Sequence, residues 1–149
     1  MPFPLPRVRS FSPWLGAGAA LLSLVSAFSF QPAPRATQAQ VARRFLSEVL
    51  RADYPAAYRR LASEVRDTLR PAAFAAATQP LWHLGQQRGP AVELYKLGTW
   101  LSEGGGPEPW FYRFSFANDS ARRPPPVLLE VTFRDTTARQ VLGFGVRNH

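Results

Sequence analysis

Residues 109–117, PWFYRFSFA, and residues 127–134, VLLEVTFR, place apolar side chains at every second position, which is the period of a β-strand. Arg113 and Glu130 fall on the faces opposite these apolar rows, where they are placed to form a cross-strand ion pair. We therefore expect two strands whose apolar faces point inward. The inward rows are Trp110, Tyr112, Phe114 and Phe116 in one strand and Val127, Leu129, Val131 and Phe133 in the other.

Two further β-rich segments, residues 91–101 and 139–147, flank this pair along the chain. Turn-forming stretches separate the segments: GGGP at 104–107, residues 118–126 and residues 135–138. The glycine-rich stretch joins two strands rather than a strand and a helix, so it is a hairpin connection and not a phosphate-binding loop. The second half of the chain is therefore predicted to form an antiparallel sheet of four strands.

In the first half of the chain, the apolar period changes to that of an α-helix. Residues 38–51 carry one apolar stripe. Asp53 is placed to cap a second helix, and Pro55 fits the first turn of that helix. The stripe of this second helix runs from Tyr58 to Leu69. The pattern predicts two consecutive helices.

A third helix is predicted over residues 71–84, with Pro80 interrupting or kinking it. Gly85 and Gly89 are expected to end it. The predicted helices precede the predicted antiparallel sheet in the chain. This order predicts an α+β domain with the helices on one side of the sheet.

The first 27 residues have the three parts of a bacterial-type signal peptide. Arg7 and Arg9 form the positive region, residues 14–25 form the apolar run, and Ala27 ends a small-residue cleavage site. The apolar run is shorter than the ~20 residues that span a bilayer, so a retained anchor is the second interpretation. A proline-containing tether is predicted over residues 28–37, and the folded domain over residues 38–149. The chain is thus expected to be exported, either to the periplasm or out of the cell, with no membrane span after removal of the signal.

The composition restricts the classes of partner and site. The chain has no cysteine, which excludes a lipoprotein anchor, disulfides and thiolate metal sites. The only histidines are His83 and the terminal His149, so no metal site and no cofactor are expected. The formal net charge of the whole chain is +8 at pH 7, which is compatible with anionic partners. Export argues against nucleic acid and leaves an electrostatic role at an outer surface.

The order of elements also resembles a known superfamily. The residues that carry the resemblance are Phe45 and Leu46, Asp53 and Tyr54, Tyr58 and Leu61, Leu81 and Trp82 with Leu84, and Gly89. Over about residues 38–89 the chain resembles the nuclear transport factor 2-like, or cystatin-like, superfamily, in particular small exported bacterial members of unknown function. The resemblance implies a curved sheet with helices on its concave face and a cone-shaped pocket between them. Some members use this pocket for catalysis, and many use it for binding or dimerisation.

The candidate ligand or interface residues are aromatic side chains and the one internal histidine. They are Tyr58, Trp82, His83, Trp100, Trp110, Tyr112 and Phe114. An enzyme would need an acid or base inside the pocket, and the carboxylates fit helix caps, solvent faces or turns instead. No residue is therefore assigned a catalytic role.

The first functional hypothesis is an exported, non-catalytic domain. It would bind a small apolar or amphipathic ligand in the cone, or pair through its sheet with itself as a homodimer or with another protein. The second hypothesis is a pocket enzyme of the isomerase or dehydratase type that uses His83 or a tyrosine. The third is an electrostatic binder of anionic envelope polymers, which requires the helix arginines to converge on one face.

Overall fold

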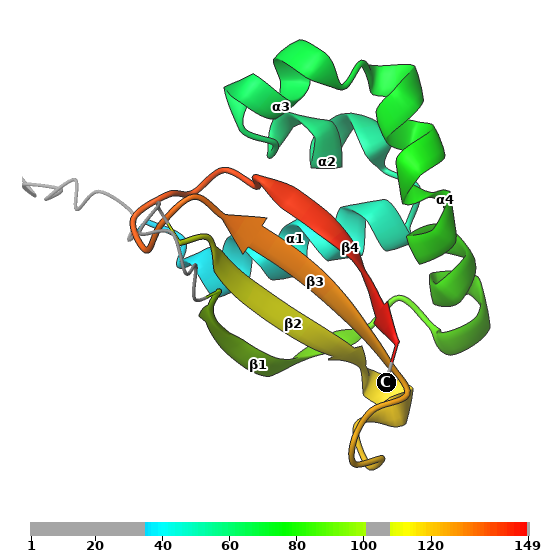
Figure 1. The fold of residues 1–149 in the computed structure, drawn as a ribbon. Coiled ribbons are helices and arrows are strands. Elements are labelled where there is room, and N and C mark those ends of the chain that lie inside the picture. The colour runs from blue at the N-terminus through cyan, green and yellow to red at the C-terminus, as the bar shows by residue number, and fades with distance from the viewer. Residues whose placement is uncertain (1–34, 101–107, 149) are drawn as a thin grey trace, which may run out of the picture. The chain divides into compact units, whose positions relative to one another are not determined.

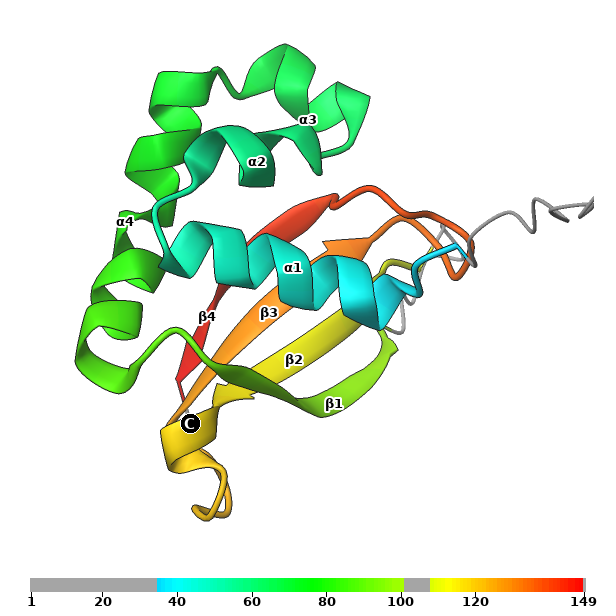
Figure 2. The same cartoon turned by 180° about the vertical axis from the view of Figure 1, so that it is seen from behind.

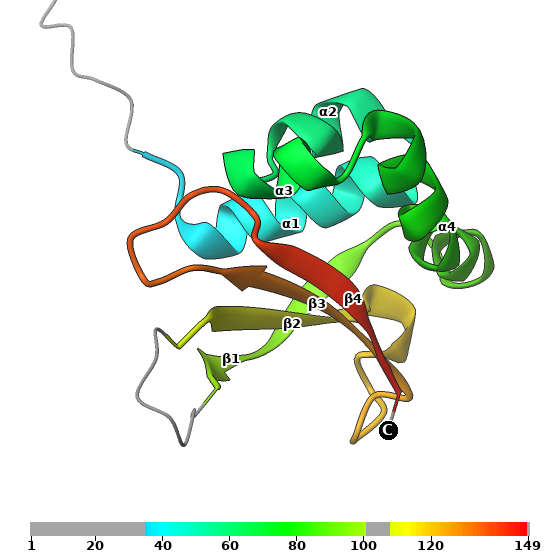
Figure 3. The ribbon, with the colours of Figure 1, turned by 45° about the horizontal axis from the view of Figure 1, so that its top comes forward.

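The computed structural model describes residues 35–100 and 108–148. The predicted signal peptide, most of the predicted tether and the glycine-rich turn at 104–107 lie outside the described residues. Within the described ranges the chain is an α+β domain, as predicted: helices pack on one face of an antiparallel sheet (Figure 1). Seen with its top brought forward, the domain has a helical layer above a sheet layer (Figure 3).

The sheet contains four strands in the order β1-β2-β3-β4. They are β1 (Val92–Thr99), β2 (Trp110–Phe116), β3 (Val127–Phe133) and β4 (Gly143–Asn148). In the register of β2 and β3, Phe114 lies opposite Leu129 and Arg113 lies opposite Glu130. The predicted inward rows and the predicted ion pair are both confirmed, the latter with 2.7 Å between Arg113 Nε and Glu130 Oε2.

The fourth strand begins at Gly143, so its predicted start at residue 139 was wrong. The segment before it is a turn that the Asp135 carboxylate organises. One carboxylate oxygen accepts hydrogen bonds from the backbone N–H of Thr137 at 2.7 Å and of Ala138 at 2.8 Å. A side chain that bonds to backbone groups two and three residues ahead favours a turn over an extended strand.

The helices are α1 (Gln38–Leu50), α2 (Tyr54–Arg59), α3 (Ser63–Thr68) and α4 (Pro71–Arg88). Thr37 and Gln40 form a capping box at the start of α1. Asp53 caps α2 as predicted, because its Oδ1 accepts the N–H of Ala56 at 3.3 Å. The predicted first helix is confirmed.

The predicted second helix was wrong as a single element, because α2 and α3 are separate. Leu61 forms a parallel bridge with Val141 between them. The N–H of Ala62 donates to the carbonyl of Val141, and the N–H of Val141 donates to the carbonyl of Arg60, each at 2.8 Å. Pairing with a segment about 80 residues away in the chain replaces the hydrogen bonds of one helical turn.

Helix α4 continues through Pro80, so the predicted interruption was wrong. The helix lies close to α1, where a Cβ on Gly85 would come within 2.9 Å of Leu50 Cδ2. Gly89, at φ 89°, ends the helix, since a side chain is strained in this conformation.

The core lies between α1 and the inward face of the sheet. Helix α1 crosses this face and packs on β1 and β2, while α4 packs on β4 (Figure 2). Phe45 of α1, Phe74 of α4 and Phe144 of β4 join the layers, with ring centroids 5.4 Å apart for Phe45 and Phe144 and 5.5 Å apart for Phe74 and Phe144. Full burial of such a side chain contributes about 1.5–3 kcal/mol to stability.

One buried polar side chain connects the start of α1 to β2 and to the turn between β3 and β4. Gln38, at the start of α1, donates to the carbonyls of Asp135 at 2.6 Å and Ala138 at 2.7 Å. Its Oε1 accepts the hydroxyl of Tyr112 at 3.2 Å. The amide therefore satisfies three groups at a position that is 4% exposed.

We expect Gln38→Ala to lower the free energy of unfolding by about 1–3 kcal/mol, because two carbonyls and the Tyr112 hydroxyl lose their partner. Urea unfolding followed by circular dichroism measures the change. Gln86→Ala, at an exposed position of α4, is the matched control and should change stability by less than about 0.5 kcal/mol. Equal effects of the two substitutions would contradict this role of Gln38.

Candidate functional site

The structure does not bring the predicted site residues together. Trp110, Tyr112 and Phe114 lie on the inward face of β2, where Phe114 is fully buried and Tyr112 nearly so. Trp110 Nε1 donates to the Tyr112 hydroxyl at 3.2 Å. These three side chains pack into the core or against it and do not line the four hollows described below. The cone-shaped pocket that the resemblance implies stays a prediction.

His83 is exposed on α4, next to the half-buried Trp82. The two rings contact each other with centroids 4.9 Å apart. Among the described residues His83 forms no hydrogen bond and no ion pair with a carboxylate. A histidine acting as general base needs a partner that orients its ring, and this geometry supplies none.

Tyr58 lines a small apolar pocket of about 240 Å³ between α2 and the start of α4, with Tyr54, Pro55, Pro71 and Phe74. Its ring packs edge-on against Phe74, and its hydroxyl donates to the carbonyl of Leu69 at 2.9 Å. The hydroxyl of Tyr54 accepts from Gln79 Nε2 at 3.2 Å. Both hydroxyls are thus used within the domain, and the pocket offers an apolar surface.

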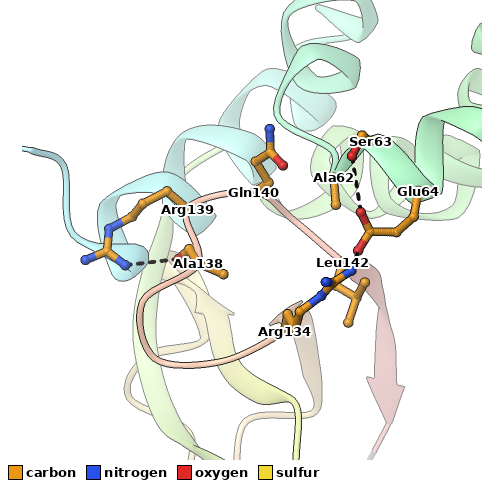
Figure 4. A pocket seen from close by; sticks show the side chains of 8 residues that line it. All are labelled: Ala62, Ser63, Glu64, Arg134, Ala138, Arg139, Gln140 and Leu142. Carbon is orange, nitrogen blue, oxygen red and sulfur yellow. Dashed lines mark hydrogen bonds and ion pairs between the residues drawn. The ribbon is translucent and has the colours of Figure 1, made fainter. Parts of the chain in front are cut away.

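A polar hollow of about 360 Å³ lies between α3 and the connection from β3 to β4 (Figure 4). The guanidinium of Arg134 reaches the carboxylate of Glu64, whereas Arg139 points away from this pair. Hydrogen bonds from the backbone N–H of Glu64 itself and from Arg134 hold the pKa of Glu64 below its usual value. A carboxylate paired in this way is a poor proton acceptor. The ion pair of Glu64 with Arg134 links α3 to the connection between β3 and β4.

Arg139 fastens the same loop to the chain before α1. Its Nε donates to the carbonyl of Ala36 at 3.0 Å, and its Nη1 donates to the carbonyl of Thr137 at 2.7 Å. The guanidinium is therefore occupied by backbone acceptors and is not presented to a ligand.

The large apolar side chains that remain exposed gather on one strand. Leu94, Tyr95, Leu97 and Trp100 are 38%, 37%, 48% and 40% exposed, and they are the large hydrophobic residues of the described ranges with this degree of exposure. All four lie in or directly after β1, the strand at one end of the sheet order. We call residues 92–100 the β1 edge. Trp100 was predicted as a site residue; the other three were missed.

The two faces of the β1 edge differ. Leu94 and Leu97 lie opposite Phe114 and Tyr112, so they belong to the α1 side of the sheet. Trp100 lies on the outer side, where its ring contacts Phe111 with centroids 5.2 Å apart. Exposed apolar side chains in such a cluster are typical of an interaction surface.

The outer face of the sheet carries a charged cluster beside Trp100. Glu130 is only 5% exposed and accepts from Arg113 Nε at 2.7 Å and from Arg147 Nη2 at 3.1 Å. The guanidinium carbons lie 5.1 Å and 5.5 Å from the centroid of Trp100, respectively. One carboxylate and one indole ring thus hold both arginines on this face.

Two arginines of α1, Arg43 and Arg44, and Arg51 directly after the helix converge on a groove of about 330 Å³. All three are exposed, and none forms an ion pair with the residues that the structure describes. The neighbouring Glu48 is already engaged by Arg60 through two hydrogen bonds of 2.6 Å and 2.5 Å, which raise the pKa of Arg60. Asp53 also lines the groove and caps α2, so the three arginines of the lining outnumber its two carboxylates by one.

No group of three or more histidine, aspartate or glutamate side chains in residues 35–100 and 108–148 is placed to hold a metal ion. In the same part of the chain, no helix is long and apolar enough to cross a membrane. Comparison with protein-family models, curated proteins and solved structures finds no match for this chain. The resemblance to the nuclear transport factor 2-like superfamily thus stays a prediction.

The Asp135 turn predicts a dependence of stability on pH. Hydrogen bonds from the side chain and backbone of Thr137 and the backbone of Ala138 hold the pKa of Asp135 below 3.8 in the folded state. A depressed pKa contributes stability above pH 3.8, and this contribution is lost as the pH falls through the folded pKa. Asp135→Asn should therefore be less stable than the unsubstituted chain at neutral pH, and the difference should shrink in acid.

Urea unfolding at neutral pH and at about pH 2.5 measures this convergence. Asp67→Asn, at an exposed carboxylate of α3, is the control and should show no convergence. A difference for Asp135→Asn that is constant over this range would contradict the assignment.

Proposed function

We propose that this chain is a non-catalytic, exported interaction domain that docks another polypeptide along the β1 edge. The observation that carries the proposal is that, within residues 35–100 and 108–148, the exposed large apolar side chains all lie in residues 94–100. Exposed apolar side chains gathered on one edge strand are typical of a surface that binds a partner. The helix-then-sheet order supports membership of the nuclear transport factor 2-like superfamily as part of this proposal.

The geometry favours a polypeptide over a small apolar ligand. The apolar pocket at Tyr58 has a volume of about 240 Å³, which is below the roughly 300–1,000 Å³ of typical small-molecule sites. The β1 edge, in contrast, offers an extended backbone with side chains on two faces. An added strand can use both the backbone hydrogen-bonding groups and the alternating side chains.

The geometry also argues against the pocket-enzyme hypothesis. His83 has a tryptophan rather than a carboxylate as its ring neighbour, and the hydroxyls of Tyr58 and Tyr112 donate to groups of the domain itself. The two tyrosine hydroxyls are therefore not free to act as a general acid or base, and no carboxylate of the described residues orients the ring of the exposed His83.

We expect a photo-crosslinking amino acid at Leu97 to form adducts with a polypeptide in the cells that produce the chain, because this side chain is 48% exposed at the centre of the β1 edge. The same amino acid at Ala76, exposed on α4, is the control. Mass spectrometry identifies the crosslinked peptide. Adducts at position 97 and not at position 76 are expected; the absence of adducts at position 97 would contradict the proposal.

A second candidate function is electrostatic, and the convergence of Arg43, Arg44 and Arg51 on one groove supports it. These three guanidinium groups form no ion pair with the described residues, although Glu48 and Asp53 line the same groove. Guanidinium groups that converge in this way are suited to a phosphate-bearing polymer. Inorganic polyphosphate is the probe we would use. Its affinity should fall as the salt concentration rises, because screening weakens contacts between exposed charges.

Replacing Arg43, Arg44 and Arg51 together with glutamine should abolish polyphosphate binding measured by calorimetry. Replacing Arg59, Arg70 and Arg123 with glutamine removes the same charge from exposed positions outside the groove and is the matched control. Equal loss in both variants would show a non-specific effect of net charge and would contradict a site on α1.

A further inference from the structure

We propose that the polypeptide docked on the β1 edge is a second copy of this chain, with the two β1 strands antiparallel about a twofold axis at Leu94. This inference rests on the proposed function and names its partner. Strand β1 ends the sheet order, so in the described residues it has a strand neighbour on one side only. The second copy would extend the sheet across its free side.

A β-bulge in β1 determines which side chains share a face. Leu94 lies opposite Phe114 and Lys96 lies opposite Arg113, so Tyr95 is the additional residue. Glu93 lies opposite Ser115. Arg113 and Ser115 are two residues apart on β2, so they share the outer face of the sheet. Glu93 and Lys96 lie opposite them and therefore share this face too. In a strand without a bulge, residues three positions apart would lie on opposite faces.

A twofold axis at Leu94 brings opposite charges together. With Tyr95 and Lys96 counted as one bulged position, Glu93 of one copy meets Lys96 of the other, and the symmetry produces this pair twice. Leu94 meets its own equivalent, and Val92 meets Leu97 of the second copy. All these pairs match in face and in chemistry, which is the requirement for antiparallel strands.

Glu93 and Lys96 are both exposed on β1. Glu93 and Lys96 form no ion pair in the part of the chain that the structure describes, and Lys96 lies opposite the like charge of Arg113. A lysine and a bulge on an edge strand normally discourage pairing with arbitrary strands. In this chain, Lys96 and the bulge discourage pairing with any strand that lacks a carboxylate opposite Lys96. The antiparallel second copy has such a carboxylate, because its Glu93 lies opposite Lys96.

The test is sedimentation equilibrium of the purified full chain and its charge-reversed variants. We expect the unsubstituted chain to be a dimer. Glu93→Lys and Lys96→Glu should each weaken the dimer by ~10-fold or more, because both symmetric pairs become repulsive. An equimolar mixture of the two variants should form a heterodimer, since each repulsive pair becomes attractive again. The double variant Glu93→Lys/Lys96→Glu should likewise dimerise.

Asp67→Lys and Arg59→Glu are the matched controls, because they reverse charges at exposed positions of α3 and α2 and should leave the dimer unchanged. Circular dichroism establishes that every variant is folded. The rescue in the mixture does not depend on the stability of either variant alone, so loss of folding cannot imitate it.

A monomeric unsubstituted chain, or a dimer that the charge reversals do not affect and the mixture does not restore, would overturn the inference. If the chain is monomeric and the crosslinks from position 97 map to another polypeptide, the proposed function stands and self-pairing is wrong. If the chain is monomeric and no crosslinks form at position 97, both are wrong.

Discussion

The inward face of β2 and β3 is a continuous row of aromatic and aliphatic side chains, and α1 is the element that removes it from water. The chain has no cysteine, so the domain depends on this burial without disulfides. The other contacts hold α1 in place. Gln38 anchors its first turn to Tyr112 and to the turn after β3, and Gly85 allows α4 to approach its last turn at Leu50.

A domain with one helical layer leaves the second face of its sheet without a covering element. On this face the side chains cover one another. Arg113 and Arg147 lie over Glu130 and beside Trp100, so the carboxylate is buried although none of the described helices α1 to α4 packs on it. The cluster holds two guanidinium groups and one carboxylate, so it keeps one net positive charge on the outer face beside the β1 edge.

The two candidate binding surfaces adjoin each other. Arg43 of the basic groove and Leu94 of the β1 edge line a common hollow of about 170 Å³ with Ala39 and Gln40. A polypeptide on the edge would therefore meet positive charge on the α1 side. In the self-pairing proposal, the contact of Glu93 with Lys96 lies on the outer side, whereas the contacts of Leu94 and of Val92 with Leu97 lie on the α1 side, next to the basic groove.

The sequence by itself determined the fold class, the first helix and the inward rows of β2 and β3, because apolar periodicity is a local property of the chain. It also predicted the ion pair of Arg113 and Glu130, since alternation fixes which side chains leave the core. Only the tertiary structure decided the break at Leu61, which pairs with Val141, and the exposure of the β1 edge. The strand order, the bulge in β1 and the exposure of Leu94 depend on contacts between residues that are distant in the chain, so no local sequence pattern encodes them.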